Sequence, residues 1–138
     1  LFGKDRTYCH VFFDLADGSS LAFFQFADAE DQAQFGPEIP ASPFIHIALN
    51  VDSGTQAEIE ARIAKAGIQP PDTYTLEHGY CRSVYVTDPN GMIVEFTCDD
   101  PRAGDGAADR RARAHAELKR WLAGDHTNNN LFRHEETV

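Results

Sequence analysis

Residues 8–26 contain two runs rich in aromatic and aliphatic residues, with polar residues among them. Asp17 and Gly18 lie between the runs, and Asp-Gly is one of the strongest short signals for a hairpin turn. Side chains that alternate with a period of two are typical of a β-strand. We therefore predict a β-hairpin here. The polar stretch 27–42, which contains proline and glycine, is predicted to be a loop with room for one helical turn.

The pairing of this hairpin follows from the length assigned to its turn. A two-residue Asp-Gly loop places His10 opposite Gln25 and Phe12 opposite Phe23. These four side chains then share one face of the hairpin. A shift of one residue would move one strand's side chains to the other face, so the prediction depends on the turn type.

The pattern then changes to a strand followed by a helix. Residues 43–51 alternate, with His46 and Asn50 on the face opposite the isoleucines. Residues 55–66 are predicted to form a helix that begins with a Thr55–Glu58 capping box and carries an apolar stripe. A glycine that follows at position 67 is a helix stop signal.

Three strands and a second helix complete the prediction. A possible short strand within 70–79 leads into residues 82–88, and a turn connects these to residues 92–98. The order from residue 43 to residue 98 is therefore β-α-β-β-β. Residues 106–123 are predicted to form a helix with apolar residues near its end, followed by a polar, irregular tail.

The turn between the last two strands decides where Glu95 points. If residues 89–91, Pro-Asn-Gly, form a three-residue loop, Tyr85 lies opposite Glu95 and Ser83 lies opposite Thr97. The alternate side chains, mostly valines, then form the face that packs on the helix. Glu95 is thus predicted to lie on the polar face of the sheet, away from the helix.

His46 and Glu95 are both predicted on that polar face. A neutral imidazole and a carboxylate suit divalent Zn, Fe, Mn, Ni or Co. At least one more ligand is needed, and Gln25 and His10 are the candidates from the hairpin. These residue types alone indicate a metal site without selecting the metal.

Composition and charge narrow the classes of partner and compartment. The 138 residues contain 12 Lys and Arg against 22 Asp and Glu, for a net charge of -10. Such a surface repels nucleic acids and anionic membranes, so neither is expected as a partner. Three cysteines without a CxxC pair argue against a secreted disulfide framework, and we expect a cytoplasmic protein.

Four segments resemble one known superfamily. They are "CHVFFDLADGSSLAFFQF", "FIHIALNV", the helix that follows, and "HGYCRSVYVTDPNGMIVEF". Together they resemble the vicinal-oxygen-chelate superfamily, which includes glyoxalase I, extradiol ring-cleaving dioxygenases and bleomycin-resistance proteins. The resemblance covers about residues 8–98.

The resemblance implies an α+β fold of paired β-α-β-β-β modules that form a cup-shaped mixed sheet. On this reading residues 1–100 are one domain, with a partial first module in 1–42 and a second module in 43–100. The first module lacks its first strand and helix, which points to a fragment, to completion by another chain, or to a degenerate site. Residues 101–138 are then a C-terminal helical extension and tail outside the resemblance.

The resemblance also implies a ligand set and a range of activities. His46 and Glu95 match ligand positions of the second module, and Gln25 lies where glyoxalase I has a glutamate. Extradiol chemistry favours Fe²⁺ or Mn²⁺, whereas Zn²⁺ or Ni²⁺ is possible for an isomerase. The expected function is an extradiol-type dioxygenase acting on a small aromatic diol. The alternatives are a glyoxalase-type lyase and a non-catalytic small-molecule-binding protein.

The remaining site residues follow from the same resemblance. His78 and Tyr85 match positions at which extradiol dioxygenases contact the bound diol, and they are the predicted catalytic residues. The small-molecule substrate is expected to meet side chains from both modules, and the protein is expected to be a homodimer. The predicted substrate-binding residues are His10, Phe12, Phe23, Asn50 and Arg82.

Overall fold

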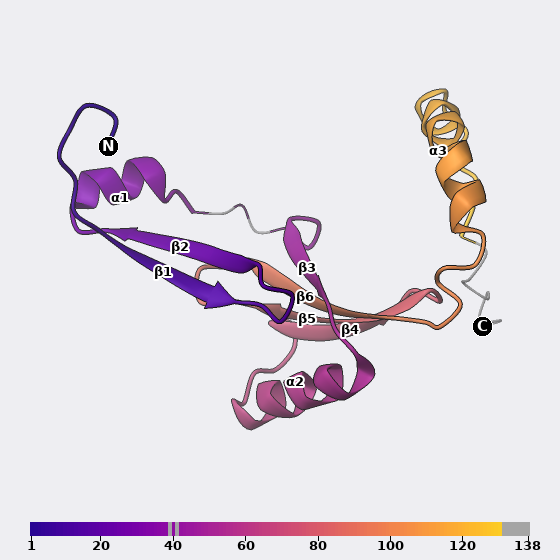
Figure 1. The fold of residues 1–138 in the computed structure, drawn as a ribbon, viewed down its shortest axis with the longest axis horizontal. Helices are drawn as coiled ribbons and strands as arrows, with labels where there is room; N and C mark the ends of the chain where they lie inside the picture. The colour runs from indigo at the N-terminus through magenta and orange to yellow at the C-terminus, as the bar shows by residue number, and fades with distance from the viewer. Residues whose placement is uncertain (39, 41, 131–138) are drawn as a thin grey trace. The chain divides into compact units, whose positions relative to one another are not determined.

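The structure is a computed structural model that describes residues 1–38, 40 and 42–130. It divides into two compact units, Leu1–Pro40 and Ala41–Val138, which we describe separately (Figure 1). The described residues contain a two-stranded antiparallel sheet, a four-stranded mixed sheet and helices. The predicted α+β class is therefore confirmed at this level. Of the predicted C-terminal tail, residues 131–138 lie outside the described residues.

The first unit is a hairpin followed by a short helix. Strands β1 (Tyr8–Asp14) and β2 (Ser20–Phe26) form the predicted hairpin. Helix α1 (Ala29–Phe35) occupies part of the stretch that we predicted to be a loop with room for one helical turn, and it is longer than that turn. It begins because the side chain of Asp28 accepts hydrogen bonds from the first-turn amides. An aspartate at the N-cap position is a common helix start signal, and Asp28 could have been identified from the sequence.

The predicted pairing of the first hairpin is wrong by one residue. His10 lies opposite Phe24 rather than Gln25, and Phe12 lies opposite Ala22 rather than Phe23. The cause is the turn, because Leu15 and Ser19 pair and enclose a three-residue loop. A two-residue loop of the kind we predicted needs positive φ at both central residues, and here only the glycine of Asp17-Gly18 has it.

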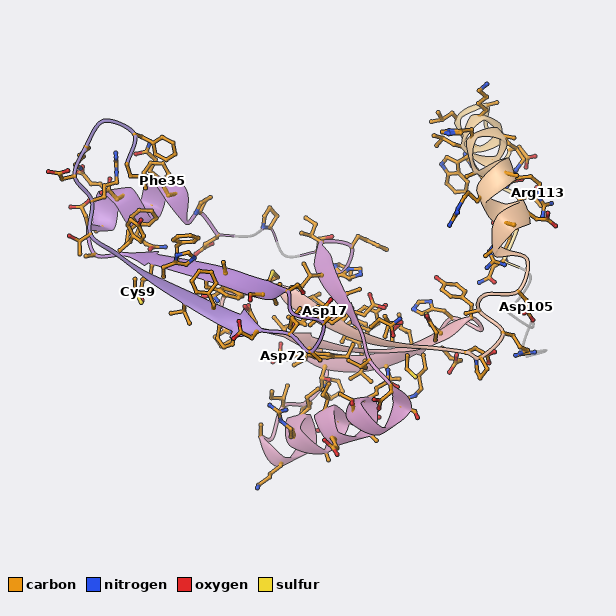
Figure 2. All side chains as sticks on the ribbon, viewed as in Figure 1. Cys9, Asp17, Phe35, Asp72, Asp105 and Arg113 are labelled. Atoms are coloured by element: carbon orange, nitrogen blue, oxygen red, sulfur yellow. The ribbon has the colours of Figure 1, made fainter. Side chains whose placement is uncertain are left out.

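An ion pair ties the helix of this unit to the chain that precedes the hairpin. Asp31 is buried and accepts from the Arg6 guanidinium at 3.0 Å. The same guanidinium lies over the ring of Phe35, which is labelled in Figure 2. Phe26 also stacks against Phe35, with ring centroids 5.3 Å apart. These contacts hold α1 near the end of β2, while every residue of β1 is exposed.

The second unit is built on a four-stranded sheet with the order β3-β6-β5-β4. β3 and β6 are parallel, and the other neighbours are antiparallel. Helix α2 joins β3 to β4, which gives the predicted β-α-β-β-β order (Figure 1). The bounds are β3 (His46–Asn50), α2 (Ser53–Lys65), β4 (Thr73–Glu77), β5 (Cys81–Thr87) and β6 (Ile93–Asp99).

Helix α2 starts two residues earlier than predicted and is capped differently. The side chain of Asp52 accepts a hydrogen bond from the amide of Thr55, so Asp52 is the N-cap and the predicted Thr55–Glu58 capping box is wrong. Gln56 is only 3% exposed. Its amide donates to the carbonyls of Arg82 and Phe96, at 2.8 Å each. The helix is therefore held on β5 and β6 by a hydrogen-bonded polar group as well as by apolar contacts.

The predicted register of the second hairpin is confirmed. Tyr85 lies opposite Glu95, and Ser83 lies opposite Thr97. Val84, on the alternate face, is 2% exposed and lines the space beneath α2 with Ile63. The sheet therefore has a face covered by the helix and a face that carries Glu95, as the alternation predicts.

Helix α3 (Ala107–Leu122) agrees with the predicted helix at 106–123. None of its residues is buried, and its apolar residues lie near its C-terminal end. Over the described part of the chain, no helix has the length and apolar character needed to cross a membrane.

Candidate functional site

His46 and Glu95 meet on the polar face of the four-stranded sheet. Glu95 is paired with Ala48 across the parallel β3–β6 ladder, and His46 lies two residues before Ala48 on the same face. His46 Nε2 and Glu95 Oε2 are 2.8 Å apart. The carboxylate is almost buried, with 7% of Glu95 exposed, whereas 27% of the imidazole side chain is exposed. The two residues that the sequence nominated as ligands are therefore in direct contact.

The contact made by His46 Nδ1 indicates which ring nitrogen carries a hydrogen. His46 Nδ1 lies 3.1 Å from the carbonyl oxygen of Pro43, and a carbonyl only accepts hydrogen bonds, so Nδ1 carries a hydrogen. In a neutral imidazole Nε2 is then an acceptor that faces a second acceptor, the carboxylate of Glu95. A proton or a metal cation between the two atoms is needed to make this contact favourable. Histidines that bind a metal through one ring nitrogen usually donate a hydrogen bond from the other to a carboxylate, a carbonyl or water.

Tyr85 adds a hydroxyl group to the same face. It lies opposite Glu95, and its hydroxyl oxygen is 3.2 Å from His78 Nε2. Burial is the main cause that raises the pKa of Tyr85 to about 12; a hydrogen bond with Ser83 opposes it, and the charge and hydrogen bond of Glu95 add smaller increases. At neutral pH the phenol is therefore protonated and acts as a hydrogen-bond donor. His78, Tyr85 and Glu95 form a continuous line of polar contacts that ends at His46.

Two aromatic contacts hold the ring of Tyr85. The rings of Tyr74 and Tyr85 stack with centroids 4.7 Å apart and an interplanar angle of 13°. The imidazole of His46 meets Tyr85 edge-on at 5.7 Å. These contacts hold the ring of Tyr85 in place, so the direction of its hydroxyl is fixed by packing as well as by hydrogen bonds.

The structure does not bring all predicted residues of this unit to the site. Asn50 shares the face of His46, but its amide donates to Asp99 at 3.2 Å at the end of the strand. Arg82 lies on the opposite face, beneath α2, where its guanidinium donates two hydrogen bonds to Glu60. It is therefore separated from Glu95 by the sheet itself.

Four predicted site residues belong to the first unit and are described within the hairpin only. His10 stacks between Phe12 and Phe24, with ring centroids 4.1 and 3.9 Å apart. Gln25 is paired with Cys9, so it lies on the other face of the hairpin from His10. Phe23 shares that second face. The prediction that His10, Phe12, Phe23 and Gln25 share one face is therefore wrong, because the turn encloses three residues rather than two.

Three groups at the site were not nominated from the sequence. They are Ser83, which is fully buried beside Tyr85, the ring of Tyr74, and the carbonyl of Pro43. The predicted register places Ser83 on the face of Glu95, so the sequence could have indicated Ser83. It could not indicate Tyr74, because the register of β4 was not predicted. It could not indicate the Pro43 carbonyl, because a backbone carbonyl occurs in every residue type.

A divalent metal site needs several donor atoms, and this site supplies two from protein side chains. His46 Nε2 and Glu95 Oε2 are adjacent, of suitable chemistry, and oriented by a carbonyl acceptor, so they fit as two ligands. No group of three or more His, Cys, Asp or Glu side chains that could hold a metal ion occurs within residues 1–38, 40 and 42–130. Any further ligand must therefore be of another type, such as an amide, a hydroxyl, water or the substrate, or come from outside this set.

The chain was also compared with known proteins. No family model matches it, and neither a curated protein nor a solved structure is similar to it at a significant level.

Proposed function

We propose that His46 and Glu95 bind a divalent metal ion and that the chain belongs to a metal-dependent enzyme. The observation that carries the proposal is the 2.8 Å contact of His46 Nε2 with the nearly buried carboxylate of Glu95, while the Pro43 carbonyl accepts from the other ring nitrogen. A cation between these atoms would resolve the contact of two acceptors. The resemblance to the vicinal-oxygen-chelate superfamily supports the same pair of ligands.

The proposal includes the architecture that the resemblance implies. Strands β3, β4, β5 and β6 with helix α2 are proposed as one β-α-β-β-β module, and the β1–β2 hairpin as part of another. The observed strand order β3-β6-β5-β4 supports a module whose first and last strands are neighbours. We also propose that the functional protein is a homodimer.

His46 and Glu95 would hold the metal, which would supply Lewis acidity to oxygen atoms of a substrate. Tyr85 would donate a hydrogen bond to a negatively charged oxygen nearby, since its raised pKa keeps the phenol protonated. His78, at 3.2 Å from the Tyr85 hydroxyl, moves a proton between this line and solvent.

Extradiol-type chemistry on a small aromatic diol is proposed ahead of glyoxalase-type isomerisation. The diol reaction needs a hydrogen-bond donor and a separate acid–base group beside the metal, and Tyr85 and His78 supply this pair of roles. Fe²⁺ or Mn²⁺ is the favoured ion on this proposal. An isomerase would instead use Glu95 as its base and accept Zn²⁺ or Ni²⁺.

The experiment that tests the proposal is metal analysis of the chain purified without chelator or affinity metal. We expect near-stoichiometric divalent metal, its loss in His46→Ala and Glu95→Gln, and its retention in His115→Ala, which removes an exposed histidine of α3. Absence of metal from the chain after addition of each ion would reject the enzyme proposal. It would leave the small-molecule-binding alternative.

A second measurement separates the two reactions. Oxygen uptake with simple catechols by the Fe²⁺- or Mn²⁺-loaded chain supports the dioxygenase proposal. Isomerisation of a thiol–aldehyde adduct without oxygen uptake would overturn it in favour of the glyoxalase type. Tyr85→Phe should slow the supported reaction more than it weakens metal binding, because Tyr85 is not proposed as a ligand.

A further inference from the structure

The segment that follows α3 folds back against the end of that helix. The Arg120 guanidinium donates to the carbonyl oxygens of Asp125 and Thr127, at 2.9 and 3.0 Å. Glu117 accepts from the same guanidinium and also from the side chain of Asn129, at 2.9 Å. Three hydrogen bonds to helix α3 thus give residues 125–129 a defined path without any helix or strand.

That path ends at the loop that carries His78. The side-chain amide of Asn130 donates to the carbonyl oxygen of His78 at 3.2 Å, and the contact is partly buried. It joins residues 52 positions apart in the sequence. This contact connects the C-terminal segment to the candidate site, which the resemblance does not anticipate.

Asn130 adds to the contacts that fix this loop, in which the amide of Gly79 donates to Glu77 and the amide of Asp100 donates to the carbonyl of Tyr80. His78 lies between β4 and β5, and its amide donates to the carbonyl of Cys81 at 2.9 Å. Gly79 has a φ of +81°, a backbone conformation that glycine adopts without strain. Beyond these features, the imidazole is held by its 3.2 Å contact with the Tyr85 hydroxyl and by stacking against Tyr80.

We infer that Asn130 is a positioning residue for His78, and that residues Asp125–Asn130 act as a strap that α3 anchors through Arg120. The strap holds the His78 backbone, which in turn sets the distance between the imidazole and the Tyr85 hydroxyl. The inference rests on the proposed function only in that His78 is proposed there to transfer a proton. The contacts themselves are independent of any metal.

The test uses amide hydrogen exchange and the ring ¹⁵N signals of His78, measured on the metal-free full chain. In Asn130→Ala we expect the His78 amide to exchange about threefold to tenfold faster, the factor that one net hydrogen bond is worth. The His78 ring signals should move towards those of an exposed histidine. Arg120→Ala should produce the same two changes by releasing the anchor.

A control variant and a double variant test whether Asn130 and Arg120 act on His78 through the same set of contacts. His115→Ala, on the same helix, should leave the His78 amide unchanged. The double variant of Asn130 and Arg120 should resemble either single variant, because both break one chain of contacts. Far-UV circular dichroism of each variant checks that the fold is retained.

Two outcomes would overturn the inference. One is faster exchange within residues 125–130 alone, with unchanged His78 amide and ring signals. The other is additive effects of the two substitutions, which would make Arg120 and Asn130 independent. Metal analysis of the unaltered chain is a separate readout, so failure of the proposed metal site and failure of the strap are distinguishable.

Discussion

The two hairpins of this molecule have the same turn and different surroundings. In β1–β2 the amide of Leu15 donates to Ser19 at 2.8 Å, and in β5–β6 the amide of Asp88 donates to Met92 at 2.8 Å. Both enclose three residues, and the last is a glycine with a φ of +86°. The Pro-Asn-Gly stretch of the second hairpin predicts this turn correctly. Asp-Gly alone suggested a shorter loop and the wrong register.

Burial separates the two hairpins more than local geometry does. Val84 of β5 is 2% exposed, whereas Val11 of β1 is 43% exposed. β5 has a strand on each side and α2 against one face, whereas within the described residues β1 pairs with β2 in a two-stranded sheet. Alternation of apolar residues therefore predicts a strand in both cases, but only neighbouring elements make it part of a core.

The largest expected effect comes from truncating the matched valines. Val84→Ala should lower the free energy of unfolding of the second unit by about 2–3 kcal/mol, through lost burial and a residual cavity. Val11→Ala should change the stability of the first unit by less than about 0.5 kcal/mol, because the side chain is already exposed. Urea unfolding followed by circular dichroism measures both.

Equal effects of the two valine substitutions would break the comparison. A large cost at Val11 would mean that β1 packs in a core of its own in solution. A small cost at Val84 would mean that α2 does not cover the sheet.

The next effect concerns the pH dependence that Tyr85 gives to the second hairpin. Its pKa is raised from 10.0 to about 12 in the fold, so the stability linked to the protonated phenol is complete below pH 10. As the pH rises from 10 to 12 the unfolded chain loses this proton first, and stability falls by on the order of 2 kcal/mol.

Tyr85→Phe should remove this loss because it removes the titrating group. Urea unfolding at several pH values between 8 and 12 measures the difference between chain and variant, in which the contributions of other groups cancel. Parallel curves for the two proteins would contradict the assigned environment of Tyr85.

The smallest effect tests whether the two turns are equivalent. Ala16 occupies the position in the first loop that Pro89 occupies in the second. Ala16→Pro should therefore be tolerated, with a gain of about 0.4–1 kcal/mol from the reduced freedom of the unfolded chain. Urea unfolding of the first unit measures it. In the two-residue loop Ala16 would be a paired strand residue, and proline would instead destabilise the hairpin.

The site illustrates how far local patterns reach. Strand alternation and a proline-containing turn were sufficient to place Tyr85 opposite Glu95 and His46 on the same face, because side chains of a strand alternate and the loop length sets the register. The order of the β-α-β-β-β segment and the position of α3 followed from the same periodicities.

Tertiary structure decided what these patterns leave open. The parallel pairing of β3 with β6 brings His46 to 2.8 Å from Glu95. The contact of Asn130 with His78 spans 52 residues, and the pairing of Arg82 with Glu60 of α2 spans 22. Sequence periodicity records which face a residue takes, whereas partners distant in the chain depend on how whole elements pack.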